Sequence, residues 1–309
     1  MSGENNKPDT QEQELWDRMS TTEGAARAEV LDELSHIAYS KNNYKECLHF
    51  IETSIEIYFS LTEDFYTKEL IHLYEGKAYC HSNLDQHREA AEAFEALAGY
   101  YCIDENREGF LRSKRAAARE WYSAKEWLKS FEGHTIASKE LDPDITKFII
   151  GIDLMNIGTA LQGLDRHQEA IESFIKARQA FKEDKNPEFV NWCDGFLAQS
   201  LIEVKNGFEA EYHAQHHFNY AKVAEDLSME GYARYRLGQA KRLNRDYVAA
   251  EDQFKEALAL LTLDEAKDWS TIVKVNNEMA ATLFAQGKDD EATTILTRIA
   301  TIEETMGDD

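Results

Sequence analysis

The chain of 309 residues holds only 3 prolines and 15 glycines. Both residues interrupt a regular helix, proline because it lacks an N–H donor and glycine because its backbone loses more entropy on folding. Their scarcity argues against a fold with many tight turns and favours long helices. Hydrophobic residues still make up 43% of the chain, which is enough for a substantial core.

Basic residues are also in short supply, since 34 Lys and Arg stand against 58 Asp and Glu and give a formal net charge of -24. Nucleic acids and anionic membranes are attracted mainly by Lys and Arg. We therefore expect no nucleic-acid partner and no membrane partner. An excess of acid also keeps a protein soluble, which is the simpler interpretation of most of this charge.

The sequence lacks paired cysteines, a signal-peptide core and a long apolar run. The four cysteines are Cys47, Cys80, Cys102 and Cys193, and none forms a Cys-x-x-Cys pair. Scattered cysteines of this kind are typical of reduced thiols. Polar residues fill positions 1–13, unlike a signal peptide, and no segment approaches the ~20 apolar residues of a membrane span. We expect a cytoplasmic protein.

A repeat of about forty residues is visible when the chain is compared with itself. Segment 84–90, followed by Phe94, is similar to 164–170, followed by Phe174, and to 245–250, followed by Phe254. Small residues recur at spacings of 43, 40, 40, 40, 40 and 42, at Cys47, Ala90, Ser130, Ala170, Ala210, Ala250 and Ala292. Twelve residues before each lies a second small residue, at Ser35, Ala78, Ala118, Gly158, Ala198, Gly238 and Ala280.

Two small positions in each repeat are what a pair of antiparallel helices needs to approach closely. Four residues after the second small position comes a large apolar residue on the same helix face, at Phe94, Phe174, Phe254 and Leu296. A second apolar set directly precedes the first small position and is expected in the core, at Leu34, Leu197, Leu237 and Met279. The pattern predicts seven helix-turn-helix repeats.

These features resemble the tetratricopeptide repeat (TPR) family. The best matches are Leu237-Gly238 with Tyr247, Ala250, Phe254 and Ala257, and Gly158 with Ala170, Phe174 and Ala177. The usual TPR has about 34 residues, so the longer period indicates longer helices or longer loops. It is similar to the extended repeats of kinesin light chains and of bacterial peptide-sensing regulators. The resemblance implies an all-α, right-handed superhelical solenoid of about seven TPR-like repeats.

Four segments are expected along the chain. A disordered amino-terminal tail covers 1–11, a leading, capping helix covers 12–27, the solenoid covers 28–305 and an acidic carboxy-terminal tail covers 306–309. Leu15, Trp16 and Met19 are expected to cover the first repeat, because the ends of a solenoid need caps. Pro143 and Pro187 fall between repeats, where a proline can stop the preceding helix.

The TPR resemblance places a ligand, typically an extended peptide, on the concave face that the first helices line. Residues six and three before the first small position, and one and four after it, are expected to face inward. Asn156 lies one step off this register and is included because it and Asn277 resemble asparagines that hold peptide backbones in related repeats. The candidate peptide-binding residues are Arg112, Arg115, Arg119, Tyr122, Tyr79, Asn156, Trp192, Gln199, Tyr232, Tyr235, Gln239, Arg242 and Asn277.

Arg112, Arg115 and Arg119 form a stripe along one expected helix. Such a stripe can clamp carboxylates through paired hydrogen bonds, which indicates a ligand with an acidic segment. In the alternative, the arginines pair on the surface with acidic residues of the same chain. The acidic residues expected in that role are Glu105, Glu108 and Glu120.

Signs of chemistry are weak. His213 and His217, with His216 between them, have a spacing that can bind a metal on a helix, but the His-Glu-x-x-His motif is missing. A solvated histidine face is the simpler interpretation, so we expect no metal and no cofactor. The sequence has neither a glycine-rich phosphate loop nor a Gly-x-Ser-x-Gly motif. We expect that the protein is not an enzyme.

The sequence therefore predicts a protein- or peptide-binding scaffold that uses the concave groove, with an acidic or carboxylate-bearing segment as its ligand. One alternative is a ligand- or peptide-responsive regulator that acts through protein contacts. A second is a homo-oligomeric assembly scaffold, and a homodimer is left open. A third is a fusion adaptor similar to the soluble attachment proteins, which are also acidic helical solenoids.

Overall fold

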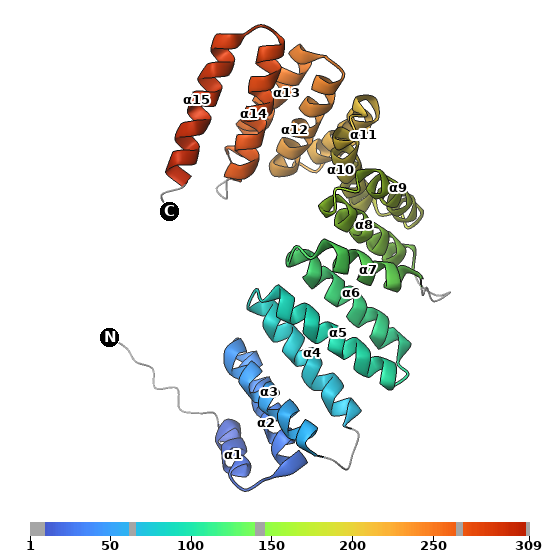
Figure 1. Cartoon of the computed structure of the whole chain (residues 1–309), viewed down its shortest axis with the longest axis vertical. Helices are drawn as coiled ribbons and strands as arrows, with labels where there is room; N and C mark the ends of the chain where they lie inside the picture. Colours follow the sequence, from blue (N-terminus) through green and yellow to red (C-terminus); the bar gives the residue numbers. More distant parts are fainter. Residues whose placement is uncertain (1–9, 62–65, 140–145, 264–267, 307–309) are drawn as a thin grey trace. The chain divides into compact units, whose positions relative to one another are not determined.

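The computed structural model of the chain describes residues 10–61, 66–139, 146–263 and 268–306. The described residues form α-helices joined by short connections and contain no β-strand (Figure 1). Most of the two predicted tails, at 1–9 and 307–309, and Pro143 lie outside the described residues. The helices are α1 (Thr10–Met19), α2 (Gly24–Ser40), α3 (Tyr44–Ser60), α4 (Thr67–Asn83), α5 (His87–Ile103), α6 (Arg107–Ser123), α7 (Trp127–Lys139), α8 (Lys147–Gly163), α9 (His167–Glu183), α10 (Pro187–Glu203), α11 (Gly207–Val223), α12 (Leu227–Leu243), α13 (Tyr247–Leu261), α14 (Trp269–Ala285) and α15 (Asp289–Met306).

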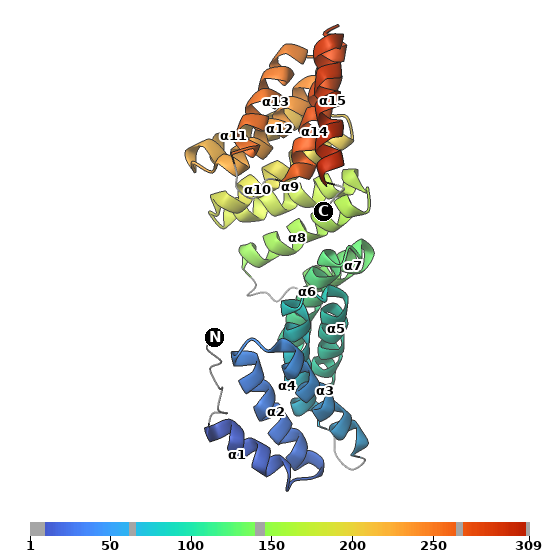
Figure 2. The ribbon, with the colours of Figure 1, turned by 90° about the vertical axis from the view of Figure 1, so that its left-hand side faces the viewer.

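The helices after α1 form seven antiparallel hairpins, from α2/α3 to α14/α15. The chain divides into two compact units, Met1–Pro143 with α1 to α7 and Asp144–Asp309 with α8 to α15. Within each unit every helix contacts the next one along the chain (Figure 2). Each unit is therefore a stack of helix hairpins, as the repeat pattern predicts. None of the described helices has the length and apolar character needed to span a membrane.

The forty-residue period comes from long helices and short turns. From α5 at His87 to α13 at Tyr247, each helix begins 20 residues after the one before it. Most of these helices have 17 residues, and three-residue turns join them both inside hairpins and between hairpins. Of the two explanations that the sequence left open, longer helices account for the period.

The two irregular spacings of small residues also have a structural cause. The connection from α3 to α4 covers residues 61–66 in place of three residues, which lengthens the first spacing to 43. Helix α13 is shorter than its neighbours and the connection after it covers 262–268, a net gain of two residues that gives 42. Helix α7 has only 13 residues, and the longer connection at 140–146 restores the 40-residue spacing there.

The three-residue turns share one backbone geometry. Their middle residue has a positive φ, at Asn42, Asp85, Glu105, Lys125, Asp165, Lys185, Lys205, Glu225 and Arg245. The N–H of the residue that follows donates to the carbonyl five residues back, as from Asn186 to Phe181 at 2.9 Å. This is the Schellman ending of a helix. The side chain of this third turn residue often caps the next helix, as Asn206 does by accepting from the N–H of Glu209.

Pro187 plays a different role from the one predicted. Helix α9 ends at Glu183, and Pro187 is the first residue of α10. The first helical position tolerates proline, because its missing N–H has no partner there in any case. Pro187 therefore opens a helix, and the positive φ of Lys185 ends the helix before it.

All fourteen small positions of the repeat are buried. At Gly158 an added Cβ would lie 2.5 Å from the ring of Phe174, and at Gly238 it would lie 2.6 Å from the ring of Phe254. Both rings are fully buried, so each glycine leaves the space that a phenylalanine of the partner helix occupies next to its backbone. Leu296, the last member of the large apolar set, is 40% exposed on α15, unlike Phe94, Phe174 and Phe254.

The leading helix covers the first hairpin. Leu15 of α1 is buried in a cluster that includes Val30, Leu31 and Phe50, and Trp16 and Met19 pack against the same cluster. The ring of Trp16 meets Phe50 edge-on at 5.7 Å. Helix α1 thus covers apolar side chains of α2 and α3 that would otherwise be exposed.

Candidate functional site

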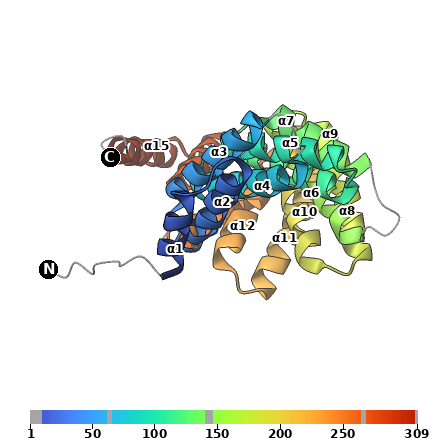
Figure 3. The same cartoon turned by 90° about the horizontal axis from the view of Figure 1, so that it is seen from below.

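The side chains on the exposed side of α2, α4 and α6 in the first unit, and of α8, α10, α12 and α14 in the second, are called here the first-helix face. Neighbouring first helices are joined by side-chain contacts between residues almost one repeat apart. Tyr39 accepts from Asn83 at 3.4 Å, and Gln162 donates to Ser200 at 2.7 Å. Helices α10 and α12 contact each other in the second unit, and α11, which connects them, lies next to both (Figure 3). The face is therefore continuous within each unit.

In the first unit this face contains a cavity of about 270 Å³ between α2 and α4. It is lined by Asp32, Ser35, His36, Tyr39, Cys47, Ile51, His72, Glu75, Gly76 and Tyr79. The residues from α2 and α4 supply most of the polar wall, and Cys47 and Ile51 of α3 supply part of the apolar wall. Tyr79, one of the predicted binding residues, is 46% exposed and meets Phe94 edge-on at 5.4 Å.

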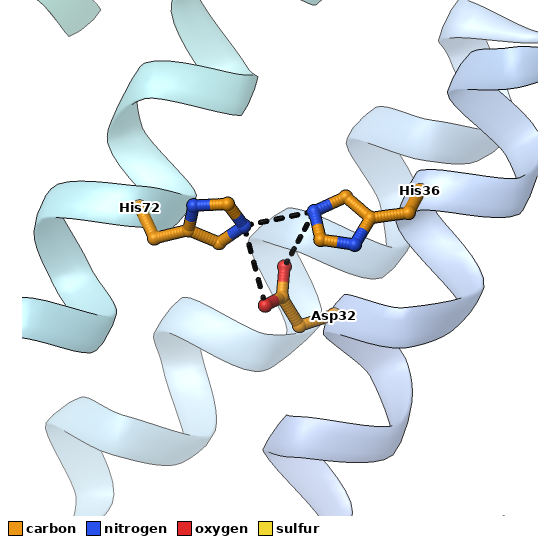
Figure 4. A group of neighbouring side chains, drawn as sticks. All are labelled: Asp32, His36 and His72. Carbon is orange, nitrogen blue, oxygen red and sulfur yellow. Dashed lines mark hydrogen bonds and ion pairs between the residues drawn. The ribbon is translucent and has the colours of Figure 1, made fainter.

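Asp32, His36 and His72 bring three potential metal ligands together at this cavity (Figure 4). The Nε2 atoms of His36 and His72 are 2.8 Å apart. The carboxylate of Asp32 faces both rings, with one oxygen 4.0 Å from His36 Nε2 and the other 3.5 Å from His72 Nε2. Among the described residues, this is the one group of three such side chains whose ligand atoms all lie within 4.8 Å of one another.

Asp32 and His36 are not among the predicted binding residues, although the register of the repeat points to both. Counted from Ser35, the residues three before and one after are Asp32 and His36, and counted from Ala78 the residue six before is His72. The signal was present in the repeat pattern. The metal-ligand spacings known from sequence motifs lie within one helix, whereas these two histidines are 36 residues apart on neighbouring repeats.

Two buried thiols lie beside the cavity. The Sγ atom of Cys80 donates to that of Cys47 at 3.2 Å, and both side chains are buried. The hydrogen bond to Cys47 and burial together raise the pKa of Cys80. Cys193 is also buried and Cys102 is exposed, and none of the four cysteines forms a disulfide in the described residues.

The arginine stripe lies on α6, and two of its three side chains already contact other residues of the chain. Arg112 is 2.9 Å from the hydroxyl of Tyr101 and 3.4 Å from the carboxylate of Glu75 on α4. Arg115 is partly buried and points to the carbonyl of Ala137 at 3.4 Å. Arg119 is exposed and pairs with no described residue.

The acidic residues proposed as partners of the stripe do not explain Arg112, whose carboxylate partner Glu75 comes from the neighbouring repeat. Glu120, one of the proposed partners, instead accepts from Ser82 at 2.7 Å and lies 2.8 Å from His87. Tyr122, one turn beyond the stripe, is 41% exposed, and its ring meets Trp127 at 5.0 Å.

In the second unit, several predicted residues of α12 are bonded to one another or to Glu278 of the next repeat. Gln239 donates to Glu278 at 3.0 Å and to Tyr235 at 3.2 Å. Arg242 pairs with the same Glu278 at 2.7 Å. Burial, assisted by the charge of Glu278, raises the pKa of Tyr235 to about 12. These side chains are therefore held in fixed positions on the face.

The remaining predicted residues are spread along the same unit. Tyr232 donates to Asp268 at 3.0 Å, and Trp192 is 39% exposed with its ring against Phe189. Asn277 is exposed, whereas Asn156 on α8 is half-buried and therefore less accessible. Apart from Tyr79 in the cavity, the structure does not gather the predicted residues into one pocket, but distributes them over the first helices of two units.

Arg236 is a further residue of this face that the register did not include. It donates to Gln199 at 3.1 Å and lies against Gly195, where an added Cβ would be 3.0 Å from its guanidinium. Burial lowers the pKa of Arg236 to about 10. Gly195 thus provides room for an arginine of the next repeat, a contact that no spacing within one helix can reveal.

The three histidines of α11 do not form a solvated face. His213 lies 2.6 Å from Asp194, a carboxylate only 3% exposed that also accepts from Arg178 at 2.8 Å. His217 is buried against Asn191 at 3.1 Å. Only His216 is exposed. The prediction of a solvated histidine face is therefore wrong for two of the three, which belong to the interior of the second unit.

Comparisons with known proteins found no matching family model and no matching curated protein. Solved structures do match. A signal-transduction ATPase with a tetratricopeptide repeat sensor from Pyrococcus horikoshii has a TM-score of 0.66 at 11% identity, over 95% of this chain and 43% of that chain. A Rap protein complexed with Competence and Sporulation Factor has 0.56 at 14%, over 89% and 76%.

A Podosopora anserina putative kinesin light chain with nearly identical TPR-like repeats has a TM-score of 0.53 at 14% identity, over 64% of this chain and 97% of that chain. Identities this low show a shared fold and nothing more. The resemblance inferred from the repeat pattern is confirmed at that level. The chain is an all-α solenoid of tetratricopeptide-like helix hairpins.

Proposed function

We propose that the protein is a non-enzymatic scaffold that binds an extended segment of another protein along the first-helix face. The observation that carries this proposal is the combination of exposed aromatic rings and fixed polar groups at the inward register positions of the first helices. Stacked hairpins present such positions at regular intervals, which suits a ligand whose side chains also recur regularly.

Three aromatic residues of the face suit the role of anchors. Tyr79, Tyr122 and Trp192 are 46%, 41% and 39% exposed. Each ring also packs against a neighbouring aromatic ring, so little side-chain entropy remains to be lost on binding. Aromatic anchors of this kind often contribute most of the binding free energy at an interface.

The polar residues of the face suit recognition of a peptide backbone. Asn277 is exposed, and an amide side chain can donate to and accept from a backbone at the same time. Gln199 and Gln239 are each held by a neighbour from the next repeat. The Rap structure that resembles this chain was solved with Competence and Sporulation Factor, which supports a binding role for the same fold here.

A direct test uses peptides selected by display on the purified protein, with affinity measured by fluorescence anisotropy. Tyr122→Ala and Tyr79→Ala, both in the first unit, should each weaken binding roughly tenfold or more, because each removes an aromatic anchor. Tyr212→Ala is the matched control, since Tyr212 is 56% exposed on α11, a second helix. Equal losses in all three variants, or none, would contradict the use of the first-helix face.

The preferred ligand charge is a separate part of the proposal. Because Arg112 is held by Tyr101 and Glu75, Arg119 is the member of the stripe best placed to meet a carboxylate of a ligand. Arg119→Glu should weaken binding of acidic peptides and leave neutral peptides almost unchanged. Lys176→Glu makes the same charge change at an exposed position of α9. If both variants bind acidic peptides equally well, the stripe does not select for acid.

A further inference from the structure

We propose that Asp32, His36 and His72 form a binding site for a divalent transition metal ion of the Zn²⁺ type. Two imidazole nitrogens and one carboxylate oxygen are a common ligand set for such ions in proteins. The three side chains come from two different repeats of the first unit and converge on one point (Figure 4). The proposal does not depend on peptide binding.

The distances suit a small metal ion after a modest adjustment. In tetrahedral zinc sites, ligands at ~2.0–2.2 Å from the metal lie roughly 3.3–3.5 Å from one another. The distance of 3.5 Å between Asp32 and His72 Nε2 already fits, and that of 4.0 Å to His36 Nε2 needs to close slightly. The two Nε2 atoms, now 2.8 Å apart, need to separate by about half an ångström.

The ligands can make this adjustment while their backbones stay fixed. The imidazoles of His36 and His72 are 59% and 50% exposed, so the rings are free to rotate. The neighbouring side chains Leu31 and Leu73 are buried in the core and hold both helices in place. Asp32 and His36 are also one turn apart on α2, which puts them on the same helix face.

Three protein ligands leave a fourth coordination position open, and the same three side chains line the cavity of about 270 Å³. An open position of this kind accepts water or a donor from a ligand. The nitrogen donors also set the expected ion class, since Ca²⁺ and Mg²⁺ prefer sites built from oxygen atoms. The histidines of α11 do not compete for the ion, because His213 is engaged by Asp194 and His217 by Asn191.

The test is zinc titration of chelator-stripped full-length protein, followed by calorimetry and by competition with a chromophoric zinc indicator. The wild type should bind one Zn²⁺ per chain, and excess Mg²⁺ should not displace it. His72→Gln, His36→Gln and Asp32→Asn should each weaken binding roughly tenfold or more, since each removes a ligand. His216→Gln removes an exposed imidazole outside the group and should bind like the wild type.

Folding is checked in the same samples. Because the histidine rings are half-exposed, their glutamine variants should unfold at the wild-type temperature without metal. Zinc should raise the unfolding temperature of the wild type and of His216→Gln, but not of His72→Gln. Absence of stoichiometric zinc binding by the wild type, or equal binding by wild type and His72→Gln, would overturn the proposal and leave a hydrogen-bonded histidine pair.

Discussion

At the residue scale, His217 shows how the interior of the second unit controls protonation. Its ring is 6% exposed and contacts Asn191 at 3.1 Å. Burial, with repulsion from Arg236 as the next cause, lowers the pKa of His217 to about 4 despite the bond to Asn191. The ring is therefore neutral in the folded protein at neutral pH, whereas the free side chain takes up a proton near pH 6.5.

His217 should make the folded state sensitive to acid. Between about pH 6.5 and pH 4 the unfolded chain binds a proton that the folded ring does not. The contribution of the neutral His217 ring to the free energy of unfolding is therefore complete above pH 6.5 and is lost as the pH decreases to 4. The loss should approach about 3 kcal/mol for a shift of this size. Urea unfolding at several pH values measures it.

The matched variants for that experiment are His217→Gln and His216→Gln. The stability difference between wild type and His217→Gln should shrink by the stated amount from pH 7 to pH 4, because glutamine does not titrate. His216 is exposed, so its variant should follow the wild-type pH profile. A pH-independent difference for His217→Gln would show that the ring is not held in its neutral form.

Single residues also show which features of the fold a sequence can reveal. The burial of Phe174 against Gly158 follows from a large and a small residue at fixed spacing. The environment of His213 does not, because its partner Asp194 lies on another helix and carries no periodic signal. Leu296 shares its pattern with Phe174 but is exposed on α15, so the pattern alone does not predict which members of the set are buried.

At the element scale, the three-residue turns between helices are unusual in the residue type at their middle position. Nine of them place a residue other than glycine at positive φ, where an L-residue is disfavoured by roughly 1–2 kcal/mol. Glycine is the usual residue at this position. The chain therefore accepts a local cost at each turn, which the packing of the 17-residue helices on either side outweighs.

Replacement of Glu225, the positive-φ residue between α11 and α12, tests this interpretation. Glu225→Gly should raise the free energy of unfolding by about 0.5–1 kcal/mol, since the relief of steric strain exceeds the added entropy of the unfolded chain. Glu225→Ala removes the same carboxylate but keeps Cβ, so it should not stabilise. A larger gain from alanine than from glycine in denaturant unfolding would contradict the strain argument.

Helix number and order followed from the sequence because two small positions repeat in every hairpin. The exact ends did not follow. Pro187 was expected to stop a helix but begins one, since a proline between two helices is compatible with either role. The longer connections after α3 and α13 appear in the sequence only as spacings of 43 and 42, with no sign of which connection is longer.

At the scale of the whole molecule, the repeat explains which residues of the candidate site can be predicted from the sequence and which contacts cannot. Residues on one first helix, such as Arg112, Arg115 and Arg119, follow from helical periodicity alone. Pairs such as His36 and His72, or Arg236 and Gln199, join neighbouring repeats and are 36 and 37 residues apart. Contacts of this class become visible only when the register of every repeat is compared with that of the next.

The central claim is that small residues recur about every forty positions because the paired helices touch at those points. Gly158 and Gly238 test it best, since an added Cβ would meet the buried rings of Phe174 and Phe254. Gly99 is the control, because it lies in the interior of α5 with no atom within 4 Å of an added Cβ.

Denaturant unfolding of the three alanine variants is the most direct measurement. Gly158→Ala and Gly238→Ala should each lower the free energy of unfolding by about 1–3 kcal/mol, because the rings have no space to move. Gly99→Ala should raise it by about 0.5–1 kcal/mol, because alanine favours a helix more than glycine does. If all three substitutions stabilise the protein equally, close helix contact is not the reason for the repeat.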